Sequence, residues 1–412
     1  MTVRADDISS RVMALVESLA VAGTSRILLA VLDGLGGLPR ENRTELELAA
    51  TPNLDRLAAK SSLGLLVPIE PGITPGSGPA HLALFGYDPV EHQIGRGVLE
   101  ALGIGLEIKH GDLCARANFA TLGGDGKVKD RRAGRIPTDE STKLCELLQQ
   151  KAGRIEDVEV IVRPGKEHRF VVVFRGEGLG EGLADSDPQH DGLVPLEVSS
   201  VQPGADKSAR VANAFIARCA EVLKKEPRAN WVLLRGLACR PALQSFAERY
   251  KLKPACVAAY PMYRGLARLV GMDILKTGET WSDEVATVRQ NVQKHDLIFA
   301  HFKETDKAGE DGDFDAKVEL LERFDEDILP KLLGLKFDVV CVTGDHSTPA
   351  TLKAHSWHPV PVLVWSRHVR PHACSMAFGE QACGRGSLGT LYSRQLMGLL
   401  LANGLRLKKF GA

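Results

Sequence analysis

The 412-residue sequence has no excess of charge of either sign. Lys and Arg together number 52, and so do Asp and Glu, which makes the formal net charge zero. Proteins that bind nucleic acids or anionic membrane surfaces usually carry a basic excess. Long apolar runs are also missing: none exceeds about seven residues, whereas a helix needs about 20 to span a bilayer. We therefore expect no nucleic-acid partner and no membrane partner.

Cysteines at metal-binding or redox spacing are absent as well. The eight cysteines are scattered along the chain, and no two have the spacing CxxC. Such cysteines are typical of buried free thiols in a reducing compartment rather than of a disulfide framework. Residues 1–20 are acidic early and predict an amphipathic helix, not a signal peptide. Together these features predict a cytoplasmic protein.

The overall composition is that of an ordinary globular protein, with 44% apolar and 25% charged residues. A chain of this length predicts two or three domains, or one domain interrupted by another. Short apolar runs, each followed by a polar or glycine-rich turn, alternate with helical segments. This order is typical of an α/β domain with a mostly parallel sheet flanked by helices. The main runs lie at residues 26–37, 295–306, 336–349 and 358–366.

The middle of the chain has a different pattern. Strand-like runs such as RFVVVF and ANWVLLRG are separated by glycine-rich and polar stretches. This pattern predicts an α+β domain inserted into the first one. The expected organisation is a core domain formed by residues 1–95 and 246–412, and an inserted domain formed by residues 96–245.

Three of the apolar runs lead to acidic side chains, at Asp33, Asp306 and Asp345. Any one such acid would more commonly be a helix cap or a loop residue. In an open α/β sheet, however, ligands bind beyond the carboxyl ends of the strands, so three acids there favour a shared site. Carboxylates and imidazoles suit Mn, Zn or Co, carboxylates alone suit Mg, and the number present is enough for two ions. The candidate ligands are Asp33, Asp306, Glu310, Asp345, His346 and His355.

A serine in the stretch ITPGSGPAHLALFGYDP, Ser77, is a candidate nucleophile. Pro79 predicts a helix start, with Ser77 just before it, and a helix N-terminus favours an anion such as a phosphorylated serine. A bound divalent ion would lower the pKa of the hydroxyl and activate it. The alternative is an ordinary turn serine. His81, four residues further on, could orient this region or be a structural histidine.

Seven motifs together resemble a known family: LDGLGG, TPNLDRLA, PGSGPAHLALFGYDP, DRRAGRI, AAYPMYRGLARLVGM, TDKAGEDGDFDAKV and TGDHSTP. In this order they are similar to the archaeal-type cofactor-independent phosphoglycerate mutases of the alkaline phosphatase superfamily. The resemblance extends from about residue 26 to the closing KKFGA.

The resemblance implies an alkaline-phosphatase-like core with two divalent metals and an inserted domain. It also implies that Ser77 accepts the phosphoryl group of 3-phosphoglycerate and returns it to the 2-hydroxyl, without 2,3-bisphosphoglycerate. One metal would be held by Asp33, Ser77, Asp345 and His346, and the other by Asp306, Glu310 and His355. Many relatives have histidine where this chain has Glu310, and a glutamate there would shift the metal preference toward Mn or Mg. Gly78 and Pro79 also depart from the Asp-Thr pair that is common in archaeal members.

Substrate binding is expected to depend on arginines, because their forked guanidinium groups match phosphate and carboxylate. Some of these arginines could equally be solvated surface charges. The candidates are Arg116, Arg131, Arg132 and Arg135 of the inserted domain and Arg264 of the core.

Three other functions stay open at this point. A metal-dependent phosphomonoesterase would use the same residues but admit water, whereas a mutase must exclude it, which the inserted domain favours. A related phosphotransferase would act on another small alcohol, such as homoserine. A non-enzymatic binding protein would be expected to have lost part of the ligand set. An assembly of identical copies is compatible with the sequence.

Overall fold

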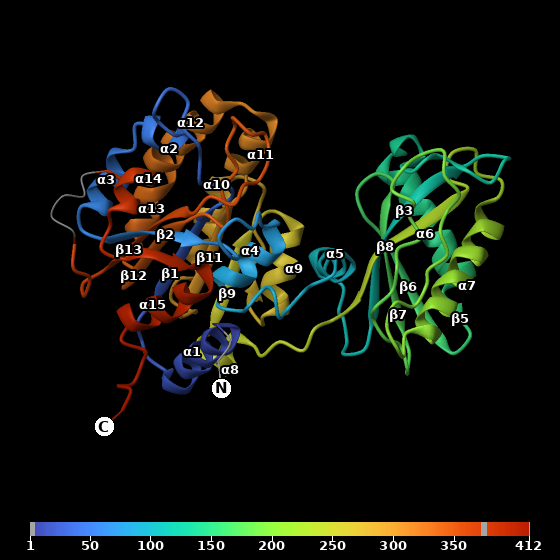
Figure 1. Ribbon diagram of the computed structural model, residues 1–412, viewed down its shortest axis with the longest axis horizontal. Coiled ribbons are helices and arrows are strands. Elements are labelled where there is room, and N and C mark those ends of the chain that lie inside the picture. Colours follow the sequence, from blue (N-terminus) through green and yellow to red (C-terminus); the bar gives the residue numbers. More distant parts are fainter. Residues whose placement is uncertain (1–4, 372–376, 412) are drawn as a thin grey trace. The chain divides into compact units, whose positions relative to one another are not determined.

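The computed structural model describes residues 5–371 and 377–411. The chain divides into two compact units, one formed by residues 1–93 and 243–412 and the other by residues 94–242. We call them the core unit and the inserted unit. Figure 1 labels their helices and strands where there is room.

The core unit takes its elements from both ends of the chain. They are α1 (Ala5–Leu19), β1 (Ile27–Leu32), α2 (Glu45–Leu48), α3 (Pro52–Ala58), β2 (Ser62–Val67), α4 (Ser77–Leu84), α8 (Phe246–Tyr250), β9 (Pro254–Ala258), α9 (Pro261–Leu269), β10 (Asp273–Ile274), α10 (Trp281–Asn291), β11 (Leu297–Phe302), α11 (Glu304–Asp311), α12 (Phe314–Arg323), the π-helical turn η2 (Phe324–Ile328), α13 (Leu329–Leu333), β12 (Val339–Thr343), β13 (Val360–Ser366), α14 (Glu380–Gly384), β14 (Gly389–Tyr392), η3 (Ser393–Gln395) and α15 (Leu396–Asn403).

An eight-stranded sheet forms the centre of this unit, in the order β10-β9-β11-β1-β12-β13-β2-β14. Every neighbouring pair is parallel except β12–β13 and β13–β2, so β13 alone runs against the others. The central strand β1, ILLAVL, is buried along its whole length, because a parallel strand is covered on both faces. The predicted α/β class with a mostly parallel sheet is confirmed.

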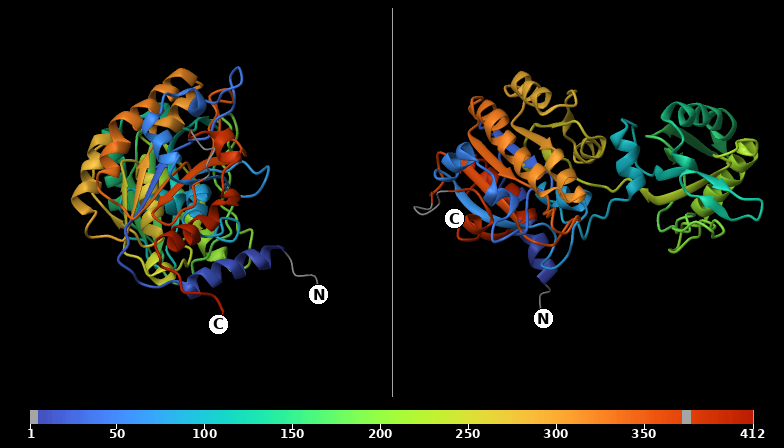
Figure 2. Two further views of the ribbon diagram at one scale, coloured as in Figure 1. Left: turned by 90° about the vertical axis from the view of Figure 1, so that its left-hand side faces the viewer. Right: turned by 90° about the horizontal axis from the view of Figure 1, so that it is seen from above.

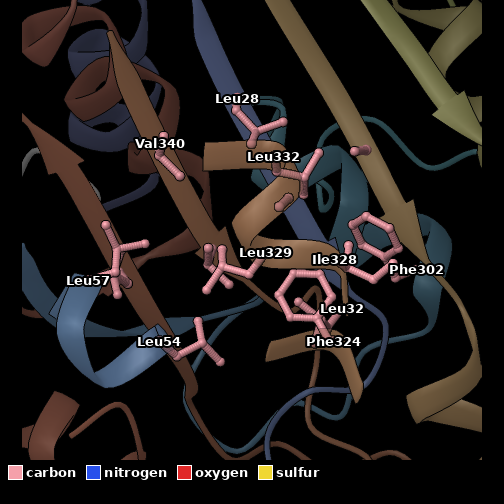
Figure 3. Packing of buried hydrophobic residues seen from close by; sticks show 14 of the residues in the cluster. Leu28, Leu32, Leu54, Leu57, Phe302, Phe324, Ile328, Leu329, Leu332 and Val340 are labelled. Carbon is pink, nitrogen blue, oxygen red and sulfur yellow. The ribbon is translucent and has the colours of Figure 1, made fainter. Parts of the chain in front are cut away.

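Helices cover both faces of the core sheet (Figure 2). On one face, Leu57 of α3 and Leu329 of α13 belong to the same apolar cluster as Leu28 of β1 (Figure 3). Successive side chains of a strand point to opposite faces, so the sheet also needs a second apolar layer. There, the ring of Phe299 on β11 meets the ring of Phe85, just after α4, with centroids 5.0 Å apart.

The inserted unit has a separate antiparallel sheet and its own helices. Its elements are α5 (Arg96–Gly103), β3 (Leu113–Leu122), β4 (Val128–Asp130), η1 (Ala133–Arg135), α6 (Thr138–Ala152), β5 (Arg154–Ile155), β6 (Val158–Pro164), β7 (Arg169–Arg175), α7 (Asp206–Leu223) and β8 (Trp231–Cys239). The strands lie in the order β4-β3-β7-β6-β5, with β8 also paired to β3. Leu148 of α6 and Phe215 of α7 pack on this sheet in one apolar cluster.

Two expectations from composition concern the whole chain. The cysteines of the described residues are all free, and all except the half-buried Cys239 are buried, whereas Cys374 lies outside the described residues. None of the helices within residues 5–371 and 377–411 is long and apolar enough to cross a membrane.

Candidate active site

Three neighbouring strands of the core sheet carry acidic side chains at one edge. β11, β1 and β12 are adjacent, and the register pairs Leu32, the last residue of β1, with Phe302, the last residue of β11. The carboxyl ends of these parallel strands therefore lie together. Asp33 follows β1 directly, Asp345 comes shortly after β12, and Asp306 lies in the first turn of α11; all three are buried.

The ligands predicted for the first metal surround Nε2 of His346. This nitrogen lies 3.4 Å from Oδ1 of Asp33, 3.1 Å from Oδ2 of Asp345 and 3.3 Å from Oγ of Ser77. The two carboxylate oxygens are buried and neither has a hydrogen bond of good geometry with a described residue, although Nδ1 of His81 lies 3.2 Å from Oδ2 of Asp345. Buried carboxylate oxygens without a donor are unfavourable. The residues therefore fit a divalent cation at this point.

The ligands predicted for the second metal are grouped more loosely. Nε2 of His355 is 3.4 Å from Oδ1 of Asp306 and 3.7 Å from Oε1 of Glu310. The Glu310 side chain is 54% exposed, which places it at the solvent edge. Asp306, His346 and His355 offer ligand atoms that all lie within 4.8 Å of one another, and the two imidazole rings stack 3.7 Å apart. His346 thus lies between the two groups, although the motif pattern assigns it to only one.

The carboxylates of Asp33 and Asp306 are held in their charged form. Burial acts to raise the pKa of Asp33, but His301 and Lys303 outweigh it and hold that pKa well below its usual value. Burial also acts against the charge of Asp306, and the hydrogen bond from His355 together with Lys303 lowers the pKa of Asp306 to about 2. The site therefore concentrates negative charge near neutral pH, which favours a bound cation.

Sequence reasoning missed side chains that reach Asp33, among them His301, Lys303 and Tyr263. Nζ of Lys303 lies 3.1 Å from Oδ2 of Asp33 and also bonds the carboxylate of Asp306. Tyr263 of α9 donates its hydroxyl to the same Oδ2. Burial raises the pKa of Tyr263 far above its usual value, and the nearby carboxylates add to this, so the phenol stays protonated. The sequence did carry signals for two of these side chains: Tyr263 lies inside the motif AAYPMYRGLARLVGM, directly before the candidate Arg264, and Lys303 is three residues before Asp306.

Close backbone contacts shape the turn after β1. Gly34 has a φ of +63°, and a Cβ there would lie 2.5 Å from Oγ1 of Thr348, so the turn requires glycine. Its N–H donates to Oδ1 of Asp345 at 3.1 Å. The buried Lys317 of α12 donates to the carbonyl oxygens of Gly34 and Thr348, each at 2.9 Å, and to that of Gly36 at 3.1 Å. These bonds tie the turn after β1 to the turn after β12.

The helix at the candidate nucleophile begins earlier than predicted. α4 starts at Ser77 itself, with Gly76 as N-cap, rather than at Pro79. The helix can begin before Pro79 because proline is compatible with any position of the first turn, where N–H groups have no partner in the helix. The free N–H groups of that turn are therefore next to the Ser77 side chain. His81 is buried, with Nδ1 2.8 Å from the Ser77 carbonyl oxygen and 3.2 Å from Oδ2 of Asp345.

The predicted substrate arginines have unlike surroundings. Arg131 forms two hydrogen bonds of 2.7 Å to Asp187, so its charge already has a partner. Arg132 and Arg135 are exposed. Arg264, in the core unit, is half-buried and donates to a main-chain carbonyl oxygen 3.0 Å away.

Arg116 belongs to a basic cluster that the sequence pattern did not reveal. On β3 it lies opposite Arg235 of β8, and Arg96 and Arg169 also approach it. Burial and the charges of these neighbours lower the pKa of Arg116. The buried Nε atoms of Arg116 and Arg169 lack a hydrogen-bond partner among the described residues, although a Glu100 oxygen lies 3.4 Å from that of Arg116. Such a cluster favours a small anion.

Solved structures share this architecture, and one of them is a cofactor-independent phosphoglycerate mutase. A Pyrococcus horikoshii protein aligns with a TM-score of 0.80 at 31% identity, covering 95% of this chain and 100% of that one. The cofactor-independent phosphoglycerate mutase from Thermoplasma acidophilum aligns with a TM-score of 0.75 at 32% identity, covering 92% of this chain and 100% of that one.

Sequence relatives identify the family. A family model described as 2,3-bisphosphoglycerate-independent phosphoglycerate mutase matches residues 58–229. A probable enzyme of that name from Thermotoga neapolitana is 53% identical, covering 96% of this chain and 98% of that protein. One from Aquifex aeolicus is 50% identical, covering 97% of this chain and 100% of that protein. The chain belongs to the 2,3-bisphosphoglycerate-independent phosphoglycerate mutase family, which confirms the resemblance seen in the motifs.

Proposed function

We propose that this protein interconverts 3-phosphoglycerate and 2-phosphoglycerate through a phosphoserine at Ser77, with two divalent metals and without 2,3-bisphosphoglycerate. The observation that carries the proposal is the convergence of Ser77 Oγ and two buried carboxylate oxygens without donors on Nε2 of His346. The names of the relatives support the same reaction. The protein would act in glycolysis and gluconeogenesis, in the cytoplasm.

The residues present fit two divalent ions. Asp33, Ser77, Asp345 and His346 would hold the first, and Asp306, His355 and Glu310 the second. The donorless oxygens of the first group and the mixed carboxylate and imidazole set of both groups support this assignment. When bound, the ions would supply Lewis-acid charge that lowers the pKa of the serine hydroxyl and neutralises phosphoryl oxygens.

The chain's own residues would carry the transfer. Oγ of Ser77 gives up its proton and forms a bond to phosphorus while the bond from phosphorus to the C3 oxygen of 3-phosphoglycerate breaks. The C3 oxygen takes up a proton and becomes a hydroxyl of the retained glycerate. The free N–H groups at the start of α4 stabilise the phosphoryl oxygens on that serine. The 2-hydroxyl of the retained glycerate then loses its proton and forms a bond to the same phosphorus, while the bond from phosphorus to Oγ breaks and Ser77 is reprotonated. The ammonium group of Lys303 adds positive charge beside Asp33 and Asp306.

The inserted unit would bind the glycerate and keep water away from the phosphoserine. Arg116 and Arg169 support this role because their buried Nε atoms have no hydrogen-bond partner in the part of the chain that the structure describes. Exposed Arg132 and Arg135 are available for the same substrate, as is Arg264 of the core unit. The Arg131 ion pair with Asp187 makes a supporting role for Arg131 more fitting than direct binding.

An enolase-coupled assay tests the function directly. Metal-free protein should be inactive toward 3-phosphoglycerate, and Mn²⁺ or Co²⁺ should restore activity better than Mg²⁺ in the absence of 2,3-bisphosphoglycerate. The imidazoles of His346 and His355 are the reason, because Mg²⁺ prefers oxygen ligands and retains its waters. Release of inorganic phosphate without 2-phosphoglycerate would instead indicate a phosphomonoesterase. Full activity in protein shown by elemental analysis to hold no metal would contradict the two-metal proposal.

Arg116→Gln is expected to raise the KM for 3-phosphoglycerate. A lost charge-assisted bond to an anion is worth about 1.5–3 kcal/mol, which corresponds to roughly 10-fold to 150-fold. Arg210→Gln is the matched control, because Arg210 is an exposed arginine of the same unit paired with Glu156, and its KM should stay within about twofold. Equal KM values for the two variants would show that Arg116 does not bind the substrate.

A further inference from the structure

The two oxygens of the Asp33 carboxylate have very different surroundings. Oδ2 is the acceptor of the Tyr263 hydroxyl, and it also lies 3.1 Å from Nζ of Lys303 and 3.4 Å from Nε2 of His301. Oδ1 accepts no hydrogen bond from the described residues and faces Nε2 of His346 at 3.4 Å. One oxygen is therefore anchored from within the protein, while the other is left for a ligand.

Among the groups around Oδ2, Tyr263 combines a buried, packed position with a hydrogen bond to this oxygen. The Lys303 side chain is 29% exposed and is shared with Asp306, and the ring nitrogens of His301 make no hydrogen bond with described residues. The Tyr263 ring is buried against the rings of His301 and His81, with centroids 3.7 Å and 4.7 Å away. A buried aromatic ring held on two sides keeps its hydroxyl in one place.

We propose that Tyr263 is a positioning residue for the first metal: by holding Oδ2 of Asp33, it turns Oδ1 toward the point shared with Asp345 and His346. A metal-ligating side chain that is already oriented by a hydrogen bond from a fixed neighbour binds the metal more tightly, because less conformational freedom is lost on binding. This inference rests on the metal role proposed above. The alternative is that Tyr263 only fills space and that its hydroxyl has merely found an acceptor.

Tyr263→Phe removes the hydroxyl and keeps the ring, so the packing against both histidines is retained. Loss of a partner of this kind typically weakens metal binding about 10-fold to 100-fold. We expect that loss for Mn²⁺, measured by titrating metal-free protein and following free Mn²⁺ by electron paramagnetic resonance. The KM for 3-phosphoglycerate at saturating Mn²⁺ should stay within about twofold, because the hydroxyl does not contact substrate in this proposal.

Tyr87→Phe is the matched control. Tyr87 is a buried tyrosine of the same unit, and its hydroxyl donates to the Gln244 carbonyl oxygen at 2.6 Å. It should lose thermal stability as Tyr263→Phe does, since each variant gives up one buried hydrogen bond, yet retain wild-type Mn²⁺ affinity. Melting temperatures of the metal-free proteins are measured on the same samples.

The outcomes separate this inference from the proposed function. Mn²⁺ affinity of Tyr263→Phe within about twofold of wild type would overturn the positioning role and leave the metal site intact. An equal loss of affinity in Tyr263→Phe and Tyr87→Phe would also overturn it, because the cause would then be general loosening of the core unit. A wild-type protein that takes up no Mn²⁺ would overturn the metal site itself and this inference with it.

Discussion

Ser77→Ala is expected to abolish the interconversion of 3-phosphoglycerate and 2-phosphoglycerate. Without Oγ there is no atom to receive the phosphoryl group, and loss of a nucleophile commonly lowers kcat by more than about 10⁴-fold. The fold should persist, because alanine is favourable in a helix and the contact of Oγ with Nε2 of His346, at 3.3 Å, is made by the side chain and not by the helix backbone. The enolase-coupled assay measures the loss.

A phosphoenzyme trap completes this experiment. Protein mixed with 3-phosphoglycerate labelled in the phosphate and then quenched in acid should retain label in the wild type and none in Ser77→Ala. Ser62→Ala, at a serine on β2 of the same unit, is the control and should behave as wild type in both measurements. Residual turnover of Ser77→Ala above about one percent would argue against a covalent route.

Lys317→Met should lower both stability and activity, although Lys317 is not a proposed ligand of metal or substrate. Its ammonium group is wholly buried and donates to the carbonyl oxygens of Gly34, Gly36 and Thr348. Methionine has a similar length but no donor, so three carbonyl oxygens would lose a bond. Removing one partner from a buried charged network commonly costs about 3–5 kcal/mol.

The activity of Lys317→Met should fall because the same bonds join the turns that follow β1 and β12. Asp33 and His346 are on those turns, and displacements of about 1 Å at a catalytic site can cost about 100-fold in rate. Denaturant unfolding measures the stability loss, and the coupled assay well below the melting temperature measures the rate. Lys331→Met, at an exposed lysine of α13, should change stability by less than about 0.5 kcal/mol. A Lys317→Met protein with wild-type stability and rate would show that the three carbonyl oxygens do not depend on Lys317.

Much of the core could be predicted because its strands are continuous apolar runs. A segment such as ILLAVL suits a strand buried on both faces, and the acid after it then lies at the carboxyl edge by geometry alone. The start of α4 was predicted two residues late, at Pro79 instead of Ser77, because proline fits every position of a first turn and does not mark the boundary itself.

The side chains around the site were harder to find. Tyr263 and Lys317 lie inside two of the quoted motifs, but the motifs do not say what these side chains contact. Their roles follow from contacts between distant parts of the chain; Tyr263 and Asp33, for example, are 230 residues apart in the sequence. The basic cluster around Arg116 also depends on contacts between distant segments, since Arg235 becomes a neighbour of Arg116 only when β3 and β8 pair. Pairing between distant strands depends on register and side-chain packing, which local patterns do not encode.

The sequence by itself determined the α/β class and the family, because apolar periodicity and ordered motifs are local properties of the chain. Only the tertiary structure decided that Asp33 turns one oxygen toward His346 and the other toward Tyr263. It also decided that Arg131 is paired with Asp187, while the Nε of Arg116 donates no hydrogen bond to a described residue. The physical reason is that the free energy of a buried charged or polar group depends on its hydrogen-bond and ion-pair partners. Those partners come from remote parts of the chain.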